Sequence, residues 1–226
     1  MKTYLRYFFY LGFNWNFRIA SYVIWHEIKG ERKYKIKPTG ADELKDLKRQ
    51  GVDISHATVY MPSTYFQLEE MFRQLPSKNR KHFMDIGCGK GRTLCLAAHF
   101  GYEKVTGVDF SEKFCEIARK NLQVVQHSFP GLKYSVVATD ASLATIPLDV
   151  DCIFLFNPFD SVIMTRVIRN IMSSLKLHPR NLNIAYANPL YKQLFLEKNF
   201  SETYYSKRLN YLELSILSFR HTVPEA

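Results

Sequence analysis

The segment Asp85–Gly91, which reads D-I-G-C-G-K-G, constrains the fold of this chain more than any other feature. It follows a short apolar run at residues 82–86 and leads into a helical pattern. Its three glycines, Gly87, Gly89 and Gly91, let a backbone turn tightly and approach a ligand closely. A strand, a glycine-rich turn and a helix in this order predict a parallel α/β sheet with a ligand at the carboxyl end of the strand.

Strands and helices alternate after this segment, as the hydrophobic periodicity indicates. We expect strands at residues 82–86, 104–108, 133–138, 151–156 and 181–187, and helices at residues 91–100, 111–127, 161–175 and 189–198. The chain then closes with two strand-like runs joined by a short turn, and strands joined in this way are antiparallel. The pattern predicts a doubly wound α/β fold, with a seven-stranded, mostly parallel sheet and an antiparallel last strand.

The N-terminal part of the chain is dense in aromatic residues at helical spacing. We expect one or two helices over residues 2–28, with a break near residues 12–16. The uncharged run between Arg6 and Arg18 is far shorter than the roughly 20 apolar residues that a membrane-spanning helix needs. Three uses of the aromatic face stay open: packing onto the rest of the chain, peripheral contact with a membrane surface through residues 1–28, and contact with a second copy.

The region between these helices and the glycine-rich turn is more polar. Residues 29–40 have the composition of a charged connector, and residues 41–50 that of a short polar helix. Pro62 opens a further helix, because proline at the first helical turn costs no backbone hydrogen bond. We therefore divide the chain into an N-terminal helical extension, residues 1–75, and a main domain, residues 76–226.

The chain carries a formal net charge of +10. A basic chain favours partners with phosphate groups, such as nucleic acid or anionic lipid, and a basic surface without such a partner explains the charge equally well. The four cysteines include no C-x-x-C pair, and no H-E-x-x-H motif is present, so we expect neither a metal site nor a disulfide framework. Reduced cysteines predict a cytoplasmic location, with membrane association left open.

Acidic residues follow the first three predicted strands. Asp85 lies two residues ahead of the first glycine, where a carboxylate suits a cationic amino group better than a pyrophosphate. Asp109, at the end of the second strand in V-T-G-V-D-F, is placed to bind both hydroxyls of a ribose. Phe110 is a candidate to flank an adenine or is a core aromatic, and Asp140 is a candidate to accept from the adenine amino group or caps a turn. Arg92 stands where the dinucleotide pattern G-x-G-x-x-G has its third glycine, which disfavours a nicotinamide cofactor.

A fourth segment, F-L-F-N-P-F at residues 154–159, ends the strand expected at residues 151–156. Asn157 would present a polar side chain beyond a buried strand, or it forms a turn with Pro158. In this order and spacing, the four segments closely resemble the class I S-adenosylmethionine-dependent methyltransferases, and the resemblance covers about residues 80–220. It implies an enzyme of this class with S-adenosylmethionine as its cofactor.

The resemblance also implies which residues form the site. Those expected to bind the cofactor are Asp85, Gly87, Gly89, Gly91, Asp109, Phe110, Asp140, Ala141 and Asn157, with Tyr60 and Ser63 as weaker candidates. Asn157 is further expected to be catalytic by orienting the methyl acceptor. Relatives that methylate nitrogen often carry N-P-P-Y or a near variant at this position, whereas this chain has N-P-F, which weakens the transfer of nitrogen specificity but leaves an amide oxygen to orient an acceptor.

The expected reaction is an in-line displacement at the methyl carbon, for which the protein aligns the two reactants and excludes water without a metal. The acceptor is left open among small molecules, nucleic acids and proteins, and no dedicated nucleic-acid-binding module is recognisable in the sequence. Two alternative functions remain: a catalytically inactive cofactor-binding or scaffold domain, and a nicotinamide-dependent oxidoreductase. Arg92 and the antiparallel final strands disfavour the oxidoreductase.

Overall fold

The protein is described by a computed structural model that covers residues 2–14, 16–36, 63–78, 80–156, 159–209 and 212–221. Three features expected from the sequence lie outside these residues: the helix at residues 41–50, Tyr60 and Asn157.

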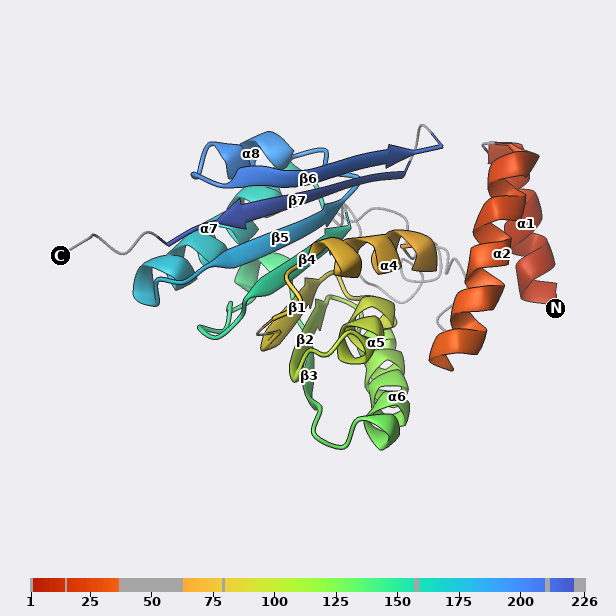
Figure 1. Cartoon of the computed structure of the whole chain (residues 1–226), viewed down its shortest axis with the longest axis horizontal. Coiled ribbons are helices and arrows are strands. Elements are labelled where there is room, and N and C mark those ends of the chain that lie inside the picture. Colours follow the sequence, from red (N-terminus) through yellow and green to blue (C-terminus); the bar gives the residue numbers. More distant parts are fainter. Residues whose placement is uncertain are drawn as a thin grey trace.

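Within the described residues, seven strands form one sheet, and helices cover both of its faces (Figure 1). The strands are β1 (His82–Ile86), β2 (Lys104–Asp109), β3 (Lys133–Ala138), β4 (Cys152–Phe156), β5 (Leu182–Ala187), β6 (Ser201–Arg208) and β7 (Leu212–Phe219). The helices are α1 (Lys2–Asn14), α2 (Phe17–Tyr34), α4 (Tyr65–Gln74), α5 (Arg92–His99), α6 (Glu112–Ser128), the short 3₁₀ helix η1 (Ala141–Leu143), α7 (Ser161–Leu177) and α8 (Lys192–Leu196).

The strand order is β3-β2-β1-β4-β5-β7-β6. Strands β1 to β5 pair in parallel, while β7 is antiparallel to both of its neighbours, β5 and β6. This confirms the doubly wound sheet with an antiparallel last strand. The order reverses direction between β1 and β4, and in open sheets of this kind a ligand binds beyond the carboxyl ends of the strands at such a switch point.

The two faces of the sheet bury separate apolar clusters, because successive side chains of a strand point to opposite faces. Phe83 lies in the cluster that β1 shares with α4, α5 and α6, whereas the next residue, Met84, lies in the cluster under α7 and α8. Both side chains are fully buried. Strands buried on both faces account for the nearly continuous apolar runs in the sequence.

The N-terminal helices form an antiparallel pair at one end of the molecule (Figure 1). Asn16 caps α2, with its Oδ1 accepting from the Ile19 backbone N–H at 2.8 Å, so the expected break falls at a side chain suited to begin a helix. Tyr7 and Leu11 of α1 pack against Ile19 and other apolar residues of α2. Among the described helices, none is long and apolar enough to cross a membrane.

The expected connector at residues 29–40 is wrong at its beginning, because α2 continues to Tyr34. Gly30 does not break the helix but lies against the ring of Tyr65, where an added Cβ would be 2.1 Å from a ring carbon. The rings of Tyr34 and Tyr65 are stacked with their centroids 5.7 Å apart. Tertiary packing onto α4 therefore outweighs the low helix propensity of glycine.

The expected start of the next helix at Pro62 is wrong, because α4 begins at Tyr65, where Thr64 caps it through a 3.3 Å bond from the Gln67 backbone N–H. Its buried side chains, including Leu68 and Phe72, belong to the same cluster as those of β1 and α5. The division of the chain at residue 75 stays a prediction, and in packing terms α4 is part of the layer that covers the sheet.

Candidate functional site

The glycine-rich turn between β1 and α5 has the backbone that its sequence predicts. Gly87, Gly89 and Gly91 have φ angles of 89°, 50° and 78°, values that residues with side chains rarely adopt. The Gly87 N–H donates to the Val108 carbonyl at 2.8 Å, which holds the turn over the end of β2. At Gly91 an added Cβ would also lie 2.8 Å from the Cβ of Ala118 on α6, so both conformation and space require glycine there.

A fourth glycine, Gly107 of β2, leaves space for the turn to pack against the sheet. An added Cβ at Gly107 of β2 would lie 2.6 Å from Leu94 Cδ1 and 2.8 Å from Cys88 Sγ. The missing side chain therefore lets α5 and the turn approach β2 closely. On the other side, the Asn121 amide of α6 donates to the Lys90 carbonyl at 2.9 Å. The turn is thus held from β2, α5 and α6 together.

Asp109 ends β2 and contacts the turn directly. Its Oδ2 accepts from the Gly89 backbone N–H at 2.8 Å, and its Oδ1 accepts from the Ser111 N–H at 2.9 Å. Burial raises the pKa of this carboxyl, and the two backbone hydrogen bonds oppose the rise. Because an ionised carboxylate offers about four acceptor sites, both oxygens retain capacity for further donors such as ribose hydroxyls.

Asp85 is the penultimate residue of β1, just before the turn, and is only 2% exposed. Burial, and then the charge of Asp109, raises the pKa of the Asp85 carboxyl well above its usual range, while a hydrogen bond from Thr93 lowers it. Two buried acids close enough to influence each other make the site favourable for a cation. This arrangement is unfavourable for a ligand whose diphosphate would occupy the turn.

Arg92 is the residue whose role sequence reasoning missed. Its Nη1 and Nη2 donate to Glu27 Oε1 and Oε2 at 2.8 and 2.6 Å, and Nη1 also donates to the Ser63 carbonyl at 2.7 Å. The guanidinium lies 4.3 Å from the centroid of the Tyr65 ring. Arg92 and Glu27 are both buried, so α2 is tied to the helix that begins at the glycine-rich turn. The available signal was an acid, Glu27, on an aromatic-rich helix, but the partner of this acid cannot be read from the sequence.

The candidate adenine residues lie at the same edge of the sheet, after β2 and β3. Phe110 is 40% exposed, so it is not a core aromatic. Asp140 caps η1, with its Oδ1 accepting from the Ser142 N–H at 2.6 Å, and Ala141 is half-buried. The cap accounts for one oxygen of Asp140, and the adenine contacts of all three residues stay predictions. In the fourth segment, Phe159 is buried against α7.

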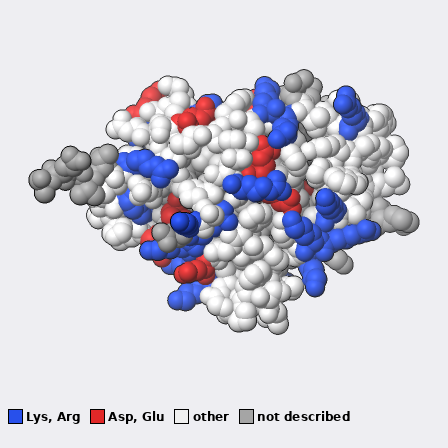
Figure 2. Space-filling view, in the orientation of Figure 1, with Lys and Arg blue, Asp and Glu red and all other residues white. Residues whose placement is uncertain are grey.

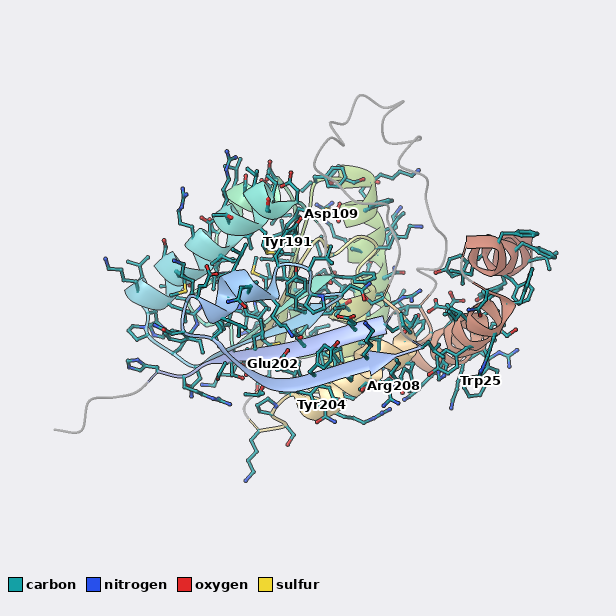
Figure 3. All side chains as sticks on the ribbon, turned by 90° about the horizontal axis from the view of Figure 1, so that it is seen from above. Trp25, Asp109, Tyr191, Glu202, Tyr204 and Arg208 are labelled. Atoms are coloured by element: carbon teal, nitrogen blue, oxygen red, sulfur yellow. The ribbon has the colours of Figure 1, made fainter. Side chains whose placement is uncertain are left out.

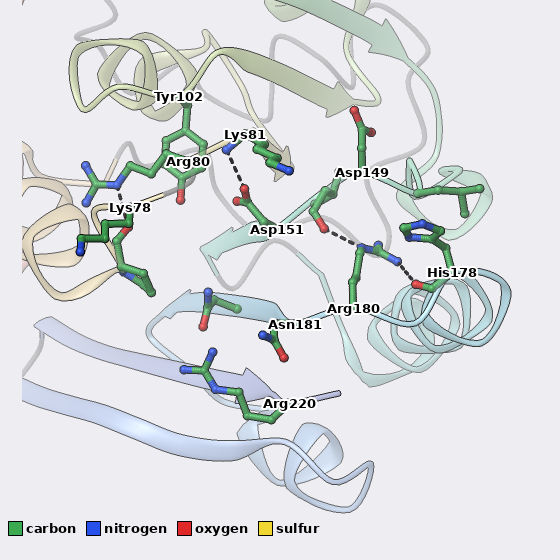
Figure 4. A pocket seen from close by; sticks show the side chains of 14 residues that line it. Lys78, Arg80, Lys81, Tyr102, Asp149, Asp151, His178, Arg180, Asn181 and Arg220 are labelled. Carbon is green, nitrogen blue, oxygen red and sulfur yellow. Dashed lines mark hydrogen bonds between the residues drawn. The ribbon is translucent and has the colours of Figure 1, made fainter. Parts of the chain in front are cut away.

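A cavity of about 410 Å³ lies at the opposite edge, where the parallel strands begin (Figure 4). Its two most buried arginines hold the fold together: Arg80 donates to the carbonyls of Pro76 and Phe100, and Arg180 donates to the Val150 carbonyl at 2.7 Å. None of the sequence-predicted site residues lines this cavity. Among the described residues, no group of three or more His, Cys, Asp or Glu side chains is arranged to hold a metal ion.

An open, doubly wound sheet with a glycine-rich turn and strand-end acids at its switch point defines a class of proteins that bind nucleotide-like cofactors. Residues 83–178 match the family model described as "Methyltransferase domain". This match supports a class I S-adenosylmethionine-dependent methyltransferase domain in that part of the chain, and the fold of that class implies binding of the cofactor.

Individual relatives are distant or match only in part. An uncharacterized protein of Haemophilus influenzae is 45% identical over 53 residues, which is 24% of this chain and 21% of that protein. Similar solved structures include StiE O-MT, with a TM-score of 0.55, 13% identity and coverage of 71% of this chain and 75% of that chain. A protein in the NADB-Rossmann superfamily from Streptococcus agalactiae has a TM-score of 0.54 and 12% identity over 73% and 72% of the two chains. These structures support the fold alone.

Proposed function

We propose that this protein transfers a methyl group from S-adenosylmethionine to an acceptor bound beyond the carboxyl ends of β4 and β5. The observation that carries the proposal is the pair of buried acids at the glycine-rich turn, Asp85 and Asp109. S-adenosylmethionine is cationic at its sulfonium and amino groups and carries a ribose diol but no phosphate. The residues present therefore fit this group better than a dinucleotide.

Each part of the turn has a role in the proposal. Asp85 and the backbone of Gly87 and Gly89 would hold the methionine portion. Asp109 would accept from the ribose hydroxyls while it still holds the Gly89 N–H. Phe110 and Asp140 would contact the adenine from the ends of β2 and β3. When bound, S-adenosylmethionine supplies an electrophilic methyl carbon.

The contribution of the protein to the reaction is alignment. Positioning an acceptor in line with a reacting carbon supplies roughly 7–11 kcal/mol of barrier reduction. We propose Asn157 as the residue that orients the acceptor, on the strength of its position after β4 in the motif that resembles the family. The acceptor class is the part of the proposal that needs an experiment, because a cofactor-binding domain without turnover would have the same turn.

The test uses S-adenosylmethionine labelled on its methyl group, the purified full chain and a cell extract separated into RNA, protein, lipid and small-molecule fractions. The proposal predicts label in one fraction with the wild type and none with Asp109→Ala. Glu103→Ala, which removes an exposed carboxylate at the opposite edge of the sheet, should retain full transfer. Wild-type protein that binds S-adenosylhomocysteine yet labels no fraction would support the alternative of an inactive cofactor-binding domain.

A further inference from the structure

The N-terminal helices expose an apolar surface on the side that faces away from the sheet. We call it the aromatic surface, and it consists of Leu5, Phe9, Phe13, Phe17 and Trp25, which are 59%, 44%, 78%, 47% and 58% exposed. The rings of its three phenylalanines touch one another: the centroids of Phe9 and Phe13 are 6.1 Å apart, and those of Phe13 and Phe17 are 5.7 Å apart. Figure 3 places Trp25 on the N-terminal helices, beyond the end of the strands where Arg208 lies.

The inner sides of both helices are already occupied. Tyr7 and Leu11 of α1 pack against α2, and Glu27 of α2 bonds Arg92 of the main domain. Trp25 lies two residues from Glu27 and therefore on the opposite side of α2, since two residues span about 200° of an α-helix. The described residues do not bury the side chains of the aromatic surface, and exposed apolar surfaces of this kind mark interaction sites.

The charges around this surface have one sign. Arg18, Lys29 and Arg32 of α2 are exposed, and the Lys29 ammonium lies 5.0 Å from the centroid of the Trp25 ring. The two carboxylates within the described parts of α1 and α2 are Glu27, which is buried, and Glu31, which is partly buried. Figure 2 shows Lys and Arg side chains gathered at the end of the molecule where α2 lies.

Exposed aromatic rings beside basic side chains favour one of two possible binding partners, a second copy of the chain or an anionic lipid surface. A second copy of the chain docked symmetrically on the aromatic surface would bring the basic side chains of both copies together, and like charges repel. An anionic lipid surface attracts the same basic side chains and takes up the aromatic rings at the level of its headgroups. We propose that the aromatic surface binds the protein peripherally to membranes that contain anionic lipids.

The location of the surface gives this binding a consequence for the orientation of the molecule. Helix α2 is anchored through Glu27 and Arg92 beside the glycine-rich turn, at the carboxyl edge of the sheet. The partly buried Leu209, between β6 and β7, packs against the cluster of the same helices. When the aromatic surface is bound to a membrane, the carboxyl edge of the sheet therefore lies at the end of the molecule that is nearer to that membrane.

The first experiment measures flotation of the full chain with phosphatidylcholine vesicles that contain phosphatidylglycerol, and with vesicles of phosphatidylcholine alone. The wild type is expected to float with the anionic vesicles and much less with the neutral ones. Phe13→Ser should lower the partition coefficient by roughly tenfold or more, because the variant loses a phenyl ring that the lipid would bury. Leu177→Ser is the matched control, since Leu177 is 77% exposed at the end of α7, and it should float as the wild type does.

A second comparison tests the charges. Lys29→Glu should reduce flotation with anionic vesicles, whereas Lys133→Glu, on an exposed residue of β3, should change it less. Wild-type protein that does not float, or Phe13→Ser protein that floats equally well, would overturn the proposal. A lipid-free dimer in sedimentation velocity that Phe13→Ser dissociates would also overturn it. Unchanged binding of S-adenosylhomocysteine by Phe13→Ser would show that the variant is folded, whatever its flotation.

Discussion

Arg92 and Glu27 form a bidentate ion pair between α5 and α2, with Nη1–Oε1 and Nη2–Oε2 distances of 2.8 and 2.6 Å. Both side chains are buried, at 3% and 1% exposure. Because Arg92 is the first residue after the glycine-rich turn, the pair joins the N-terminal helices to the site that we propose for the cofactor. The N-terminal extension is therefore a structural support of that site.

Glu27→Gln should destabilise the protein by about 3–5 kcal/mol, because the variant leaves the guanidinium of Arg92 buried without its counter-charge. Urea unfolding followed by circular dichroism measures this change. Glu69→Gln is the matched control, since Glu69 pairs with Lys33 and Arg73 at the surface, where such pairs contribute about 0–1 kcal/mol. Equal effects of the two variants would contradict a structural role for the buried pair.

Asp85→Asn should make the protein more stable at neutral pH and at the same time weaken its binding of S-adenosylhomocysteine. The folded state raises the pKa of the Asp85 carboxyl above its ordinary value of 3.8, mainly through burial. Its contribution to stability is therefore fully present below pH 3.8 and is lost as the pH rises through the folded pKa. Asparagine removes that loss, with an expected gain of roughly 0.5–2 kcal/mol at neutral pH.

The measurement is the unfolding free energy of the wild type and of Asp85→Asn at acidic and neutral pH. The stability difference between Asp85→Asn and wild type should grow as the pH rises and shrink in acid. A variant that is less stable than wild type at neutral pH would indicate that Asp85 serves the fold and is not a strained group kept for a cationic ligand.

Gly91→Ala should cost more stability than Gly101→Ala and should also abolish binding of S-adenosylhomocysteine. Both glycines have positive φ angles, 78° and 89°, so each alanine is strained by about 1–2 kcal/mol. Only at Gly91 does the added Cβ also meet another residue, Ala118 at 2.8 Å, whereas nothing lies within 4 Å of it at Gly101. Thermal melts and calorimetric titration of both variants measure the difference, and normal affinity in Gly91→Ala would argue against the turn as the cofactor site.

The stability of the wild type should fall as the pH drops below 6.5, in part because of His82. Burial lowers the pKa of this histidine from 6.5 in the folded state, so the unfolded chain binds the proton first and folding stability decreases with acid. The partner Asp149 stays ionised in this range, because hydrogen bonds from His82 and Lys104 hold its pKa at about 2 against the opposing effect of burial.

His82→Gln should flatten this part of the pH profile, measured as unfolding free energy between neutral pH and about pH 5. His127→Gln, which changes an exposed histidine of α6, is the control and should leave the slope as in the wild type. A slope that is the same in all three proteins would assign the pH dependence to other groups.

The sequence allowed the order of strands and helices in the sheet to be predicted, because each strand is a short apolar run and each helix an amphipathic one. It also indicated that Asp85 and Asp109 lie at strand ends. It did not indicate that α2 continues through Gly30, since that depends on packing against Tyr65. Local propensity cannot supply such a tertiary contact.

The same limit applies within the site. The position of Asp109 was predictable, but its bonds from the Gly89 and Ser111 N–H groups depend on how the turn folds back over β2. Arg92 was recognised only as a departure from a glycine pattern, because its partner Glu27 lies 65 residues earlier in the chain. Contacts that join distant segments decide these roles, and a single sequence carries no direct record of them.

The most direct test of the account is calorimetric titration of the full chain with S-adenosylhomocysteine, with NAD as the comparison ligand. The account predicts saturable binding of S-adenosylhomocysteine to the wild type, loss of that binding in Asp109→Ala, and no binding of NAD. Binding of NAD in place of S-adenosylhomocysteine, or binding of neither ligand, would contradict the assignment of the glycine-rich turn and its two acids as the site for the methyl donor.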